Sequence, residues 1–208
     1  MKYQLLKLLV FVFIFSSCCN EDSIETARYE LSPEELELIP YQIGQQISFK
    51  HSKGYTFSFE TIQDKVEWKE FHDFCERNCG GQDYFSYQVK NTQIQSSYPK
   101  LTVDFSLGET EHGDYNPMVL NININRRHFI SLPYDSLGNI SCDETTNTIY
   151  HDSIVLNNVY YYDVLEKPFD SHYFIQDTSI LIPESILYND YGLIQIKMSN
   201  NEAYSINN

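Results

Sequence analysis

The sequence predicts a mainly β protein, built as a single antiparallel β-sheet domain with one or two short helices. Apolar and polar residues alternate with a period of two in several segments, among them 55–60, 101–107 and 120–125, and this is the period of half-buried strands. The strand segments follow one another without alternating helices, which favours antiparallel over parallel pairing. The pattern does not separate a sandwich from a half-barrel or a curved open sheet.

Further strands are expected near 84–95, 129–132, 154–165, 173–182 and 192–198. Turn-rich pieces separate the strands, at Ser52-Lys53-Gly54, Gly80-Gly81, Leu137-Gly138-Asn139 and Ser199-Asn200-Asn201. Proline and glycine together number only 15 of 208 residues, so no long linker divides the chain.

Two segments predict helices. Ser32 is a capping residue followed by Pro33 at the first helical position and by Glu35 three residues after the cap, which predicts a short helix that Pro40 ends. The segment 64–78 spaces Trp68, Phe71 and Phe74 near the helical period, so a helix is favoured there over a strand.

Composition and charge exclude one class of function. The chain has 42% apolar residues, too many for a disordered protein, and its 208 residues fit one ordinary domain. Lysine and arginine number 14 against 29 aspartate and glutamate, which gives a formal charge of -15. This is the wrong sign for binding nucleic acid through its phosphates.

The N-terminus has the layout of a secretory signal peptide. Lys2 and Lys7 precede a continuous apolar run, 8–15, which two serines follow. That run is far shorter than the ~20 residues of a membrane-spanning helix, so we expect cleavage rather than retention.

The end of this signal, Phe15-Ser16-Ser17-Cys18, resembles the lipobox of bacterial lipoproteins, in which the cysteine becomes the lipidated first residue. Cys18 fits that pattern better than Cys19. Cleavage before Cys18 removes two lysines and leaves 12 basic against 29 acidic residues, a charge of -17. Because anionic headgroups repel such a surface, acyl chains are the expected anchor. The chain then divides into a signal peptide, 1–17, a lipidated acidic tether, 18–40, and a β-rich domain, 41–208.

Other features resemble small lipoproteins of Bacteroidota. Asn20-Glu21-Asp22 is similar to the export tag of their outer-membrane lipoproteins, although a solvated tether explains the same residues. Two motifs support the resemblance: Tyr41-x2-Gly44-x2-Ile47-x-Phe49 followed by Ser52-x-Gly54, and Tyr191-Gly192-Leu193-Ile194-x-Ile196 with Tyr204 closing a last hairpin. The resemblance implies a lipid-anchored protein of the bacterial outer membrane, on its periplasmic or surface face. It implies no activity.

Three further thiols, Cys75, Cys79 and Cys142, are disulfide candidates because an exported chain meets an oxidising compartment. Their pairing does not follow from their spacing, and a local bridge between Cys75 and Cys79 competes with a bridge from Cys142 to either. A zinc site formed by these thiols with His72 is the alternative. It is disfavoured because zinc requires reduced thiolates, and no metal or cofactor is expected.

One strand face is a candidate ligand surface. Asn121, Asn123 and Asn125 share it, and Arg126 and Arg127 follow. Amides with guanidinium groups beside them suit a glycan or a carboxylate. The alternative interpretation is the wet face of a sheet.

Tyrosine is unusually frequent, with 17 residues that include Tyr160, Tyr161 and Tyr162. Exposed tyrosines suit recognition because a rigid ring contributes area at low entropy cost. Sequence motifs of hydrolases, phosphate-binding loops and dinucleotide sites are missing, and no enzyme activity is expected. The sequence therefore favours a binding or accessory module for a glycan, a peptide or an envelope protein. A carrier of a lipid or lipoprotein is the alternative, and a hydrolase is third.

Overall fold

The computed structural model describes residues 24–72, 84–109, 118–125, 128–134, 147–169 and 182–207. The chain forms two compact units. The larger contains Glu30–Trp68 and Gln88–Asn208, and the smaller contains Met1–Tyr29 and Lys69–Tyr87.

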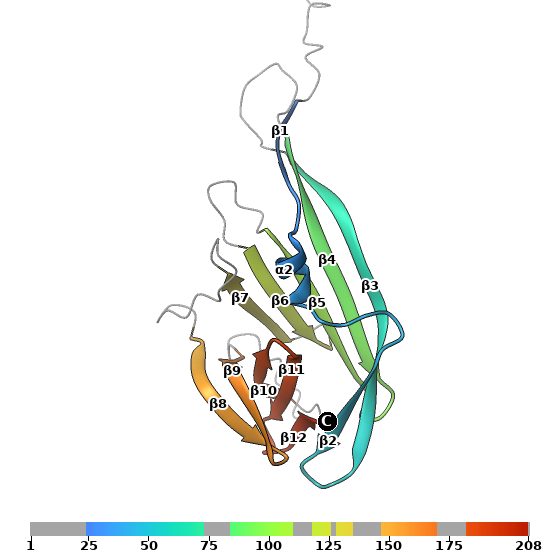
Figure 1. Ribbon diagram of the computed structural model, residues 1–208. Helices are drawn as coiled ribbons and strands as arrows, with labels where there is room; N and C mark the ends of the chain where they lie inside the picture. The colour runs from blue at the N-terminus through green and yellow to red at the C-terminus, as the bar shows by residue number, and fades with distance from the viewer. Residues whose placement is uncertain are drawn as a thin grey trace, which may run out of the picture. The chain divides into compact units, whose positions relative to one another are not determined.

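The prediction of a mainly β, antiparallel fold is confirmed. Of the sandwich, the half-barrel and the curved open sheet that the sequence left open, the structure has the half-barrel, which is one curled sheet (Figure 1). Its strands are β2 (Gln46–His51), β3 (Thr56–His72), β4 (Tyr84–Ser96), β5 (Leu101–Glu109), β6 (Met118–Ile124), β7 (His128–Tyr134), β8 (Ile149–Leu156), β9 (Val159–Pro168), β10 (Pro183–Asn189), β11 (Gly192–Met198) and β12 (Ala203–Ile206). Their order in the sheet is β7-β6-β5-β4-β3-β2-β12-β11-β10-β9-β8.

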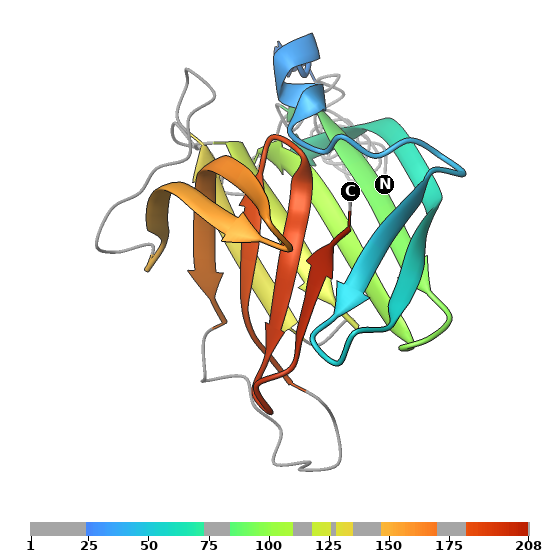
Figure 2. The same cartoon turned by 60° about the horizontal axis from the view of Figure 1, so that its bottom comes forward.

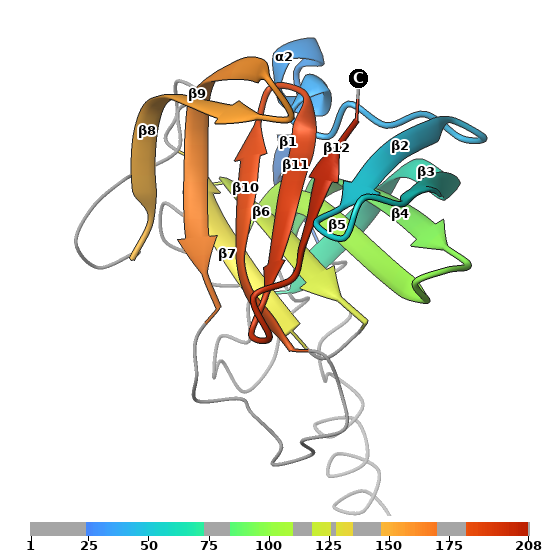
Figure 3. The same cartoon turned by 90° about the horizontal axis from the view of Figure 1, so that it is seen from below.

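This order consists of two meanders joined by one long-range seam. Strands β2 to β7 and strands β8 to β12 each pair with their neighbours in the chain. The seam is the antiparallel pair of β2 with β12, in which Phe49 lies opposite Ile206 and His51 opposite Tyr204. Figures 2 and 3 show β12 beside β2.

The core lies on the inner face of the curl. The predicted alternation is confirmed in β5, where Val103 and Phe105 are buried and Asp104 between them is only half-buried. The ring of Phe105 lies 6.3 Å from that of Tyr188 in β10, and five strands of the sheet order separate β5 from β10. The two rings therefore meet across the interior of the curled sheet, where each buried side chain of this size contributes about 1.5–3 kcal/mol.

The predicted helix is confirmed as α2 (Pro33–Glu37). The Ser32 amide donates to Glu35 Oε2 (2.6 Å), and the Glu35 amide donates to Ser32 Oγ (3.2 Å), which is a complete capping box. At the other end, Lys90 Nζ donates to the carbonyls of Leu36 (2.9 Å) and Ile39 (2.7 Å). Lys90 thus ties the last turn of α2 to β4, and burial lowers the pKa of its ammonium group.

The segment predicted to be a tether has structure in its described part. Strand β1 (Glu25–Tyr29) pairs in parallel with β4 within the smaller unit. In the larger unit the side chain of Ile39 is fully buried, and Tyr188 donates its hydroxyl proton to the Leu38 carbonyl. Residues 31–41 therefore belong to the folded body of the larger unit.

Two expectations about elements were wrong. Residues 64–72 are not helical but continue β3, because cross-strand bonds hold them: Thr92 Oγ1 donates to Asp64 Oδ1 (2.8 Å), and Asn91 Nδ2 donates to Glu67 Oε1 (3.1 Å). The strand expected at 154–165 is two strands, β8 and β9. Asn157 and Asn158 between them have φ of 51° and 66°, as a two-residue hairpin turn requires.

The predicted turns at 52–54 and 199–201 are confirmed, since they join β2 to β3 and β11 to β12. The strand expected at 173–182 lies outside the described residues except for its last position, and the turns at 80–81 and 137–139 lie outside them entirely.

Candidate functional site

Several predicted site residues lie outside the described residues: Cys18, Cys75, Cys79, Cys142, Arg126 and Arg127. Lipidation, the disulfide pairing and the zinc alternative therefore stay predictions. Within the described ranges, no three histidine, cysteine, aspartate or glutamate side chains gather in a way that suits a metal ion. The one helix in those ranges, α2, is too short and too polar to cross a membrane.

Asn121 and Asn123 lie on β6, as predicted, and alternate with the buried Leu120, Ile122 and Ile124, whereas Asn125 directly follows the strand in a turn. Asn121 Oδ1 accepts a hydrogen bond from Ser131 Oγ of β7 (2.8 Å). Asn125 has a φ of 55° and accepts at Oδ1 from the Thr102 amide (2.9 Å). Two of the three amides thus hold neighbouring strands and a turn together, which fits the wet-face interpretation better than a ligand surface.

Tyr160 and Tyr162 form the more exposed surface. They lie two residues apart on β9, so both rings point to the same side of the hairpin. The residues are 64% and 63% exposed, and the rings lie nearly parallel, with 6.5 Å between centroids and 19° between planes. Tyr161, between them, points inward and is only 2% exposed. We call Tyr160 and Tyr162 the tyrosine pair.

The two residues directly opposite the tyrosine pair on β8 are uncharged. Tyr160 lies directly opposite Val155 of β8, and Tyr162 lies opposite Ser153. Val155 is 53% exposed and extends the apolar surface. Cross-strand pairs of this kind share one face of a hairpin, so the four side chains form a flat surface with two phenol hydroxyls.

The opposite side of the hairpin fixes this surface in place. Ile154, Leu156 and Val159 pack against the core. At the hairpin turn, Asn157 Nδ2 donates to the Ile206 carbonyl at the end of β12 (3.1 Å). The β8–β9 hairpin, drawn in orange in Figures 2 and 3, is therefore held both along its length and at its tip. A ligand meets rings whose position is already set.

A second polar cluster centres on Glu166. Its carboxylate accepts from Lys197 Nζ (2.6 Å) and Ser185 Oγ (3.3 Å) and contacts His151 Nε2 (3.0 Å). Burial opposes ionisation of Glu166, but the hydrogen bonds from Lys197 and His151 outweigh it and lower the pKa of the carboxyl group. In a hydrolytic triad the histidine contacts the serine. Here His151 and Ser185 each contact the Glu166 carboxylate instead, so the cluster does not form a triad.

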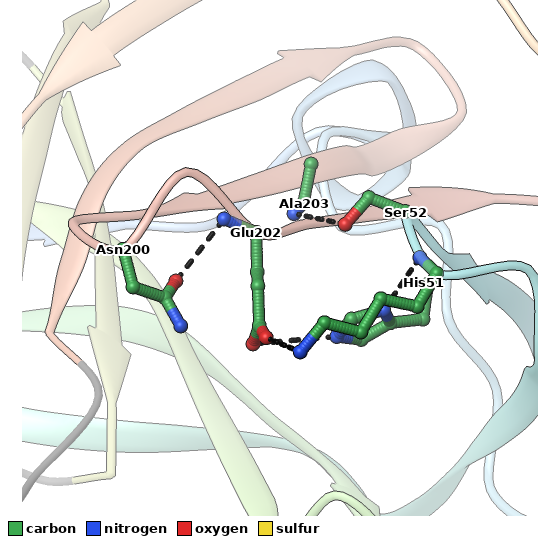
Figure 4. Close-up of polar contacts among 6 residues, drawn as sticks. His51, Ser52, Asn200, Glu202 and Ala203 are labelled. Atoms are coloured by element: carbon green, nitrogen blue, oxygen red, sulfur yellow. Dashed lines mark hydrogen bonds and ion pairs between the residues drawn. The ribbon is translucent and has the colours of Figure 1, made fainter.

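A third cluster joins the turns on either side of the seam (Figure 4). The Ser52 amide donates to the Ala203 carbonyl (2.8 Å), and the Ala203 amide donates back to Ser52 Oγ (3.2 Å). Glu202 accepts from the Lys53 ammonium group and lies 3.4 Å from His51 Nε2. The bond from Lys53, with that from Asn200, lowers the pKa of Glu202 to about 2.

Each polar contact in this third cluster links one turn to the other or fixes one turn. His51 Nδ1 accepts from the Lys53 amide (2.9 Å), which leaves Nε2 as the nitrogen that donates to Glu202. The His51 ring stacks on Tyr55, with centroids 4.4 Å apart. We infer that the contacts of this cluster stabilise the pairing of β2 with β12.

The two sequence motifs that resemble Bacteroidota lipoproteins meet in the fold. The Leu193 amide donates to the hydroxyl oxygen of Tyr41 (2.6 Å) inside the core. Tyr204 of the last hairpin packs against His51 of the first, with ring centroids 5.0 Å apart. The two motifs therefore contact each other within the folded sheet. They are not part of the tyrosine pair.

The run Tyr160-Tyr161-Tyr162 is evident in the sequence, but the sequence does not indicate which of these rings face outward. The faces follow from the turn at Asn157 and Asn158, which sets the register of β8 against β9. The dipeptide Asn157-Asn158 is the sequence signal for this hairpin turn, because asparagine tolerates positive φ better than most residues. Comparisons of this chain with protein-family models, with curated proteins and with solved structures found no match.

Proposed function

We propose that this protein is a lipid-anchored lipoprotein of the bacterial outer membrane that binds a glycan through the tyrosine pair, without a catalytic role. The observation that supports binding most directly is the pair itself: two rings, each more than 60% exposed and nearly parallel, on a hairpin fixed to the core. Rigid tyrosines of this kind offer contact area at low entropy cost and a hydroxyl for hydrogen bonding.

The chemistry of the surface favours a glycan among the three ligand classes. Sugar rings have C–H faces that lie flat on aromatic rings, and their hydroxyls bond to phenol groups. The directly opposite residues, Val155 and Ser153, provide no charge for a peptide terminus or an ionic side chain. The mature chain, at -17, also repels acidic ligands. A neutral glycan meets all these conditions.

The anchor in this proposal is an acylated Cys18. The lipobox Phe15-Ser16-Ser17-Cys18 and the preceding apolar run support it. Two or more acyl chains are needed for stable attachment, at about 0.8 kcal/mol for each buried methylene group.

A carrier of a lipid or lipoprotein is the second candidate, because a curled antiparallel sheet is suited to sheltering an apolar ligand. The half-barrel favours it. Large buried side chains occupy the inner face, however, among them Tyr41, Phe105 and Tyr188. The glycan proposal is the better supported of the two because its surface is already accessible.

Removing the tyrosine pair tests the proposal. The purified protein is run through native gels that contain mannan, xylan, starch or peptidoglycan-derived glycan. We expect at least one polymer to retard it. We expect Tyr160→Ala/Tyr162→Ala to weaken that binding by about fivefold to 150-fold, since each of the two aromatic contacts contributes about 0.5–1.5 kcal/mol.

The matched control is Tyr191→Ala, because Tyr191 is equally exposed, at 64%, but lies between β10 and β11 and outside the pair. It should retain wild-type retardation, and the circular dichroism of all variants should stay the same. Equal retardation of the double variant and the wild type, or no retardation by any polymer, argues against the proposal.

A further inference from the structure

The smaller unit has its own aromatic cluster. Phe85 of β4 lies 6.0 Å from Tyr29 of β1 in an edge-to-face contact, 5.1 Å from Phe71 of β3 and 5.8 Å from Tyr87, measured between ring centroids. Parallel pairing of β1 with β4 brings Tyr29 opposite Tyr87. The cluster is only partly covered, because Tyr29 is 49% exposed and Ile24, at the start of the described chain, is 64% exposed.

Two exposed apolar side chains lie at the ends of β1. Ile24 directly precedes this strand and Tyr29 is its last residue. Such a surface indicates a contact with an apolar or interfacial partner.

The position of the unit in the chain identifies that partner. Ile24 lies only six positions after Cys18. A fully extended chain spans at most about 3.6 Å per residue, so Ile24 lies within about 22 Å of an acylated Cys18. This maximum distance equals only a few times the thickness of the polar headgroup layer. Any fold of the intervening residues brings the unit closer.

We infer that the smaller unit rests on the lipid surface, with Ile24 and Tyr29 in the interfacial layer of the bilayer. This inference rests on the proposed lipid anchor at Cys18. Tyrosine suits that layer because its ring is apolar and its hydroxyl is polar.

The lipid headgroups that suit this surface are zwitterionic. From Cys18 onward, the sequence of the unit has seven acidic and three basic residues, a charge of -4. Anionic lipids therefore repel it. Contact with the interface should be stronger on phosphatidylcholine than on vesicles rich in phosphatidylserine.

Depth-dependent quenching tests the inference on the full lipidated protein. The chain has one tryptophan, Trp68, and two reporters are made by combining Trp68→Phe with Tyr29→Trp or with Tyr160→Trp. Each protein is reconstituted into phosphatidylcholine vesicles whose acyl chains are brominated near the headgroup. We expect quenching of the Tyr29→Trp reporter to be about twofold or more stronger than quenching of the Tyr160→Trp reporter.

Flotation of the vesicles separates the two possible failures. Protein that floats with the vesicles but shows equal quenching at both positions overturns the interfacial contact and leaves the anchor intact. Protein that does not float with them refutes the anchor, and the contact fails with it. Because positions 29 and 160 are both exposed, the substitutions should leave the circular dichroism unchanged.

Discussion

Gly192→Ala is expected to destabilise the protein by about 3 kcal/mol or more, from the sum of backbone strain and overpacking. Gly192 has a φ of +86°, which an alanine adopts only with strain. A Cβ at this position would also lie 2.7 Å from Cζ of Tyr41 and 3.2 Å from Cγ of Pro40. The Tyr41 ring is buried and its hydroxyl holds the Leu193 amide, so it has little freedom to move.

Gly54→Ala is the matched control for this prediction. Gly54 has a similar φ of +96°, but nothing lies within 4 Å of a Cβ built there. Gly54→Ala is therefore expected to lower the stability only through backbone strain, by about 1–2 kcal/mol. Urea unfolding of both variants gives the comparison. Equal loss of stability in the two would show that the contact between Tyr41 and the β10–β11 turn does not constrain the fold.

Alkaline unfolding is the second large effect, and it is expected as the pH rises above 10. Burial raises the pKa of the Tyr41 and Tyr134 hydroxyls, and burial raises that of Tyr188 well above its ordinary value of 10. A phenol with a raised folded-state pKa stabilises the fold fully below pH 10. That contribution falls as the pH rises towards the folded-state pKa, because only the unfolded chain readily ionises.

Phenolate absorbance and circular dichroism, followed together against pH, measure this effect. A group of phenols should ionise only in step with the loss of β structure. Tyr134→Phe removes one of the three, and it is expected to move the unfolding midpoint to higher pH. Complete ionisation of all tyrosines while the circular dichroism stays native would contradict the assignment of these three as buried.

Local patterns in the sequence predicted those elements whose physics is local. The helix at 33–37 follows from Ser32 and Glu35, which bond to each other's amides within one turn. The alternation in β5 follows from one polar and one apolar face, and it predicted which side chains of that strand are buried. The turn at Gly54 required only a residue that tolerates positive φ.

Elements decided by long-range contacts were missed. The helical spacing of Trp68 and Phe71 was overridden by the pairing of β3 with β4, since partners such as Asn91 are distant in the chain. The seam of β2 with β12 joins residues more than 150 positions apart, and no local pattern indicates it. The sequence likewise showed the tyrosines of β9 but not which of them are exposed, because the outward side of β9 depends on its register with β8.

The proposed anchor is tested most directly by labelling cells with radioactive palmitate while they express the full chain, and comparing Cys18→Ser with Cys19→Ser. The two thiols are adjacent, so the second variant controls for the loss of a cysteine at this place. We expect label in the wild type and in Cys19→Ser, and none in Cys18→Ser, which should leave the membrane fraction. Label that persists in Cys18→Ser, or a wild-type protein that takes up no label, would contradict a lipid anchor at this residue.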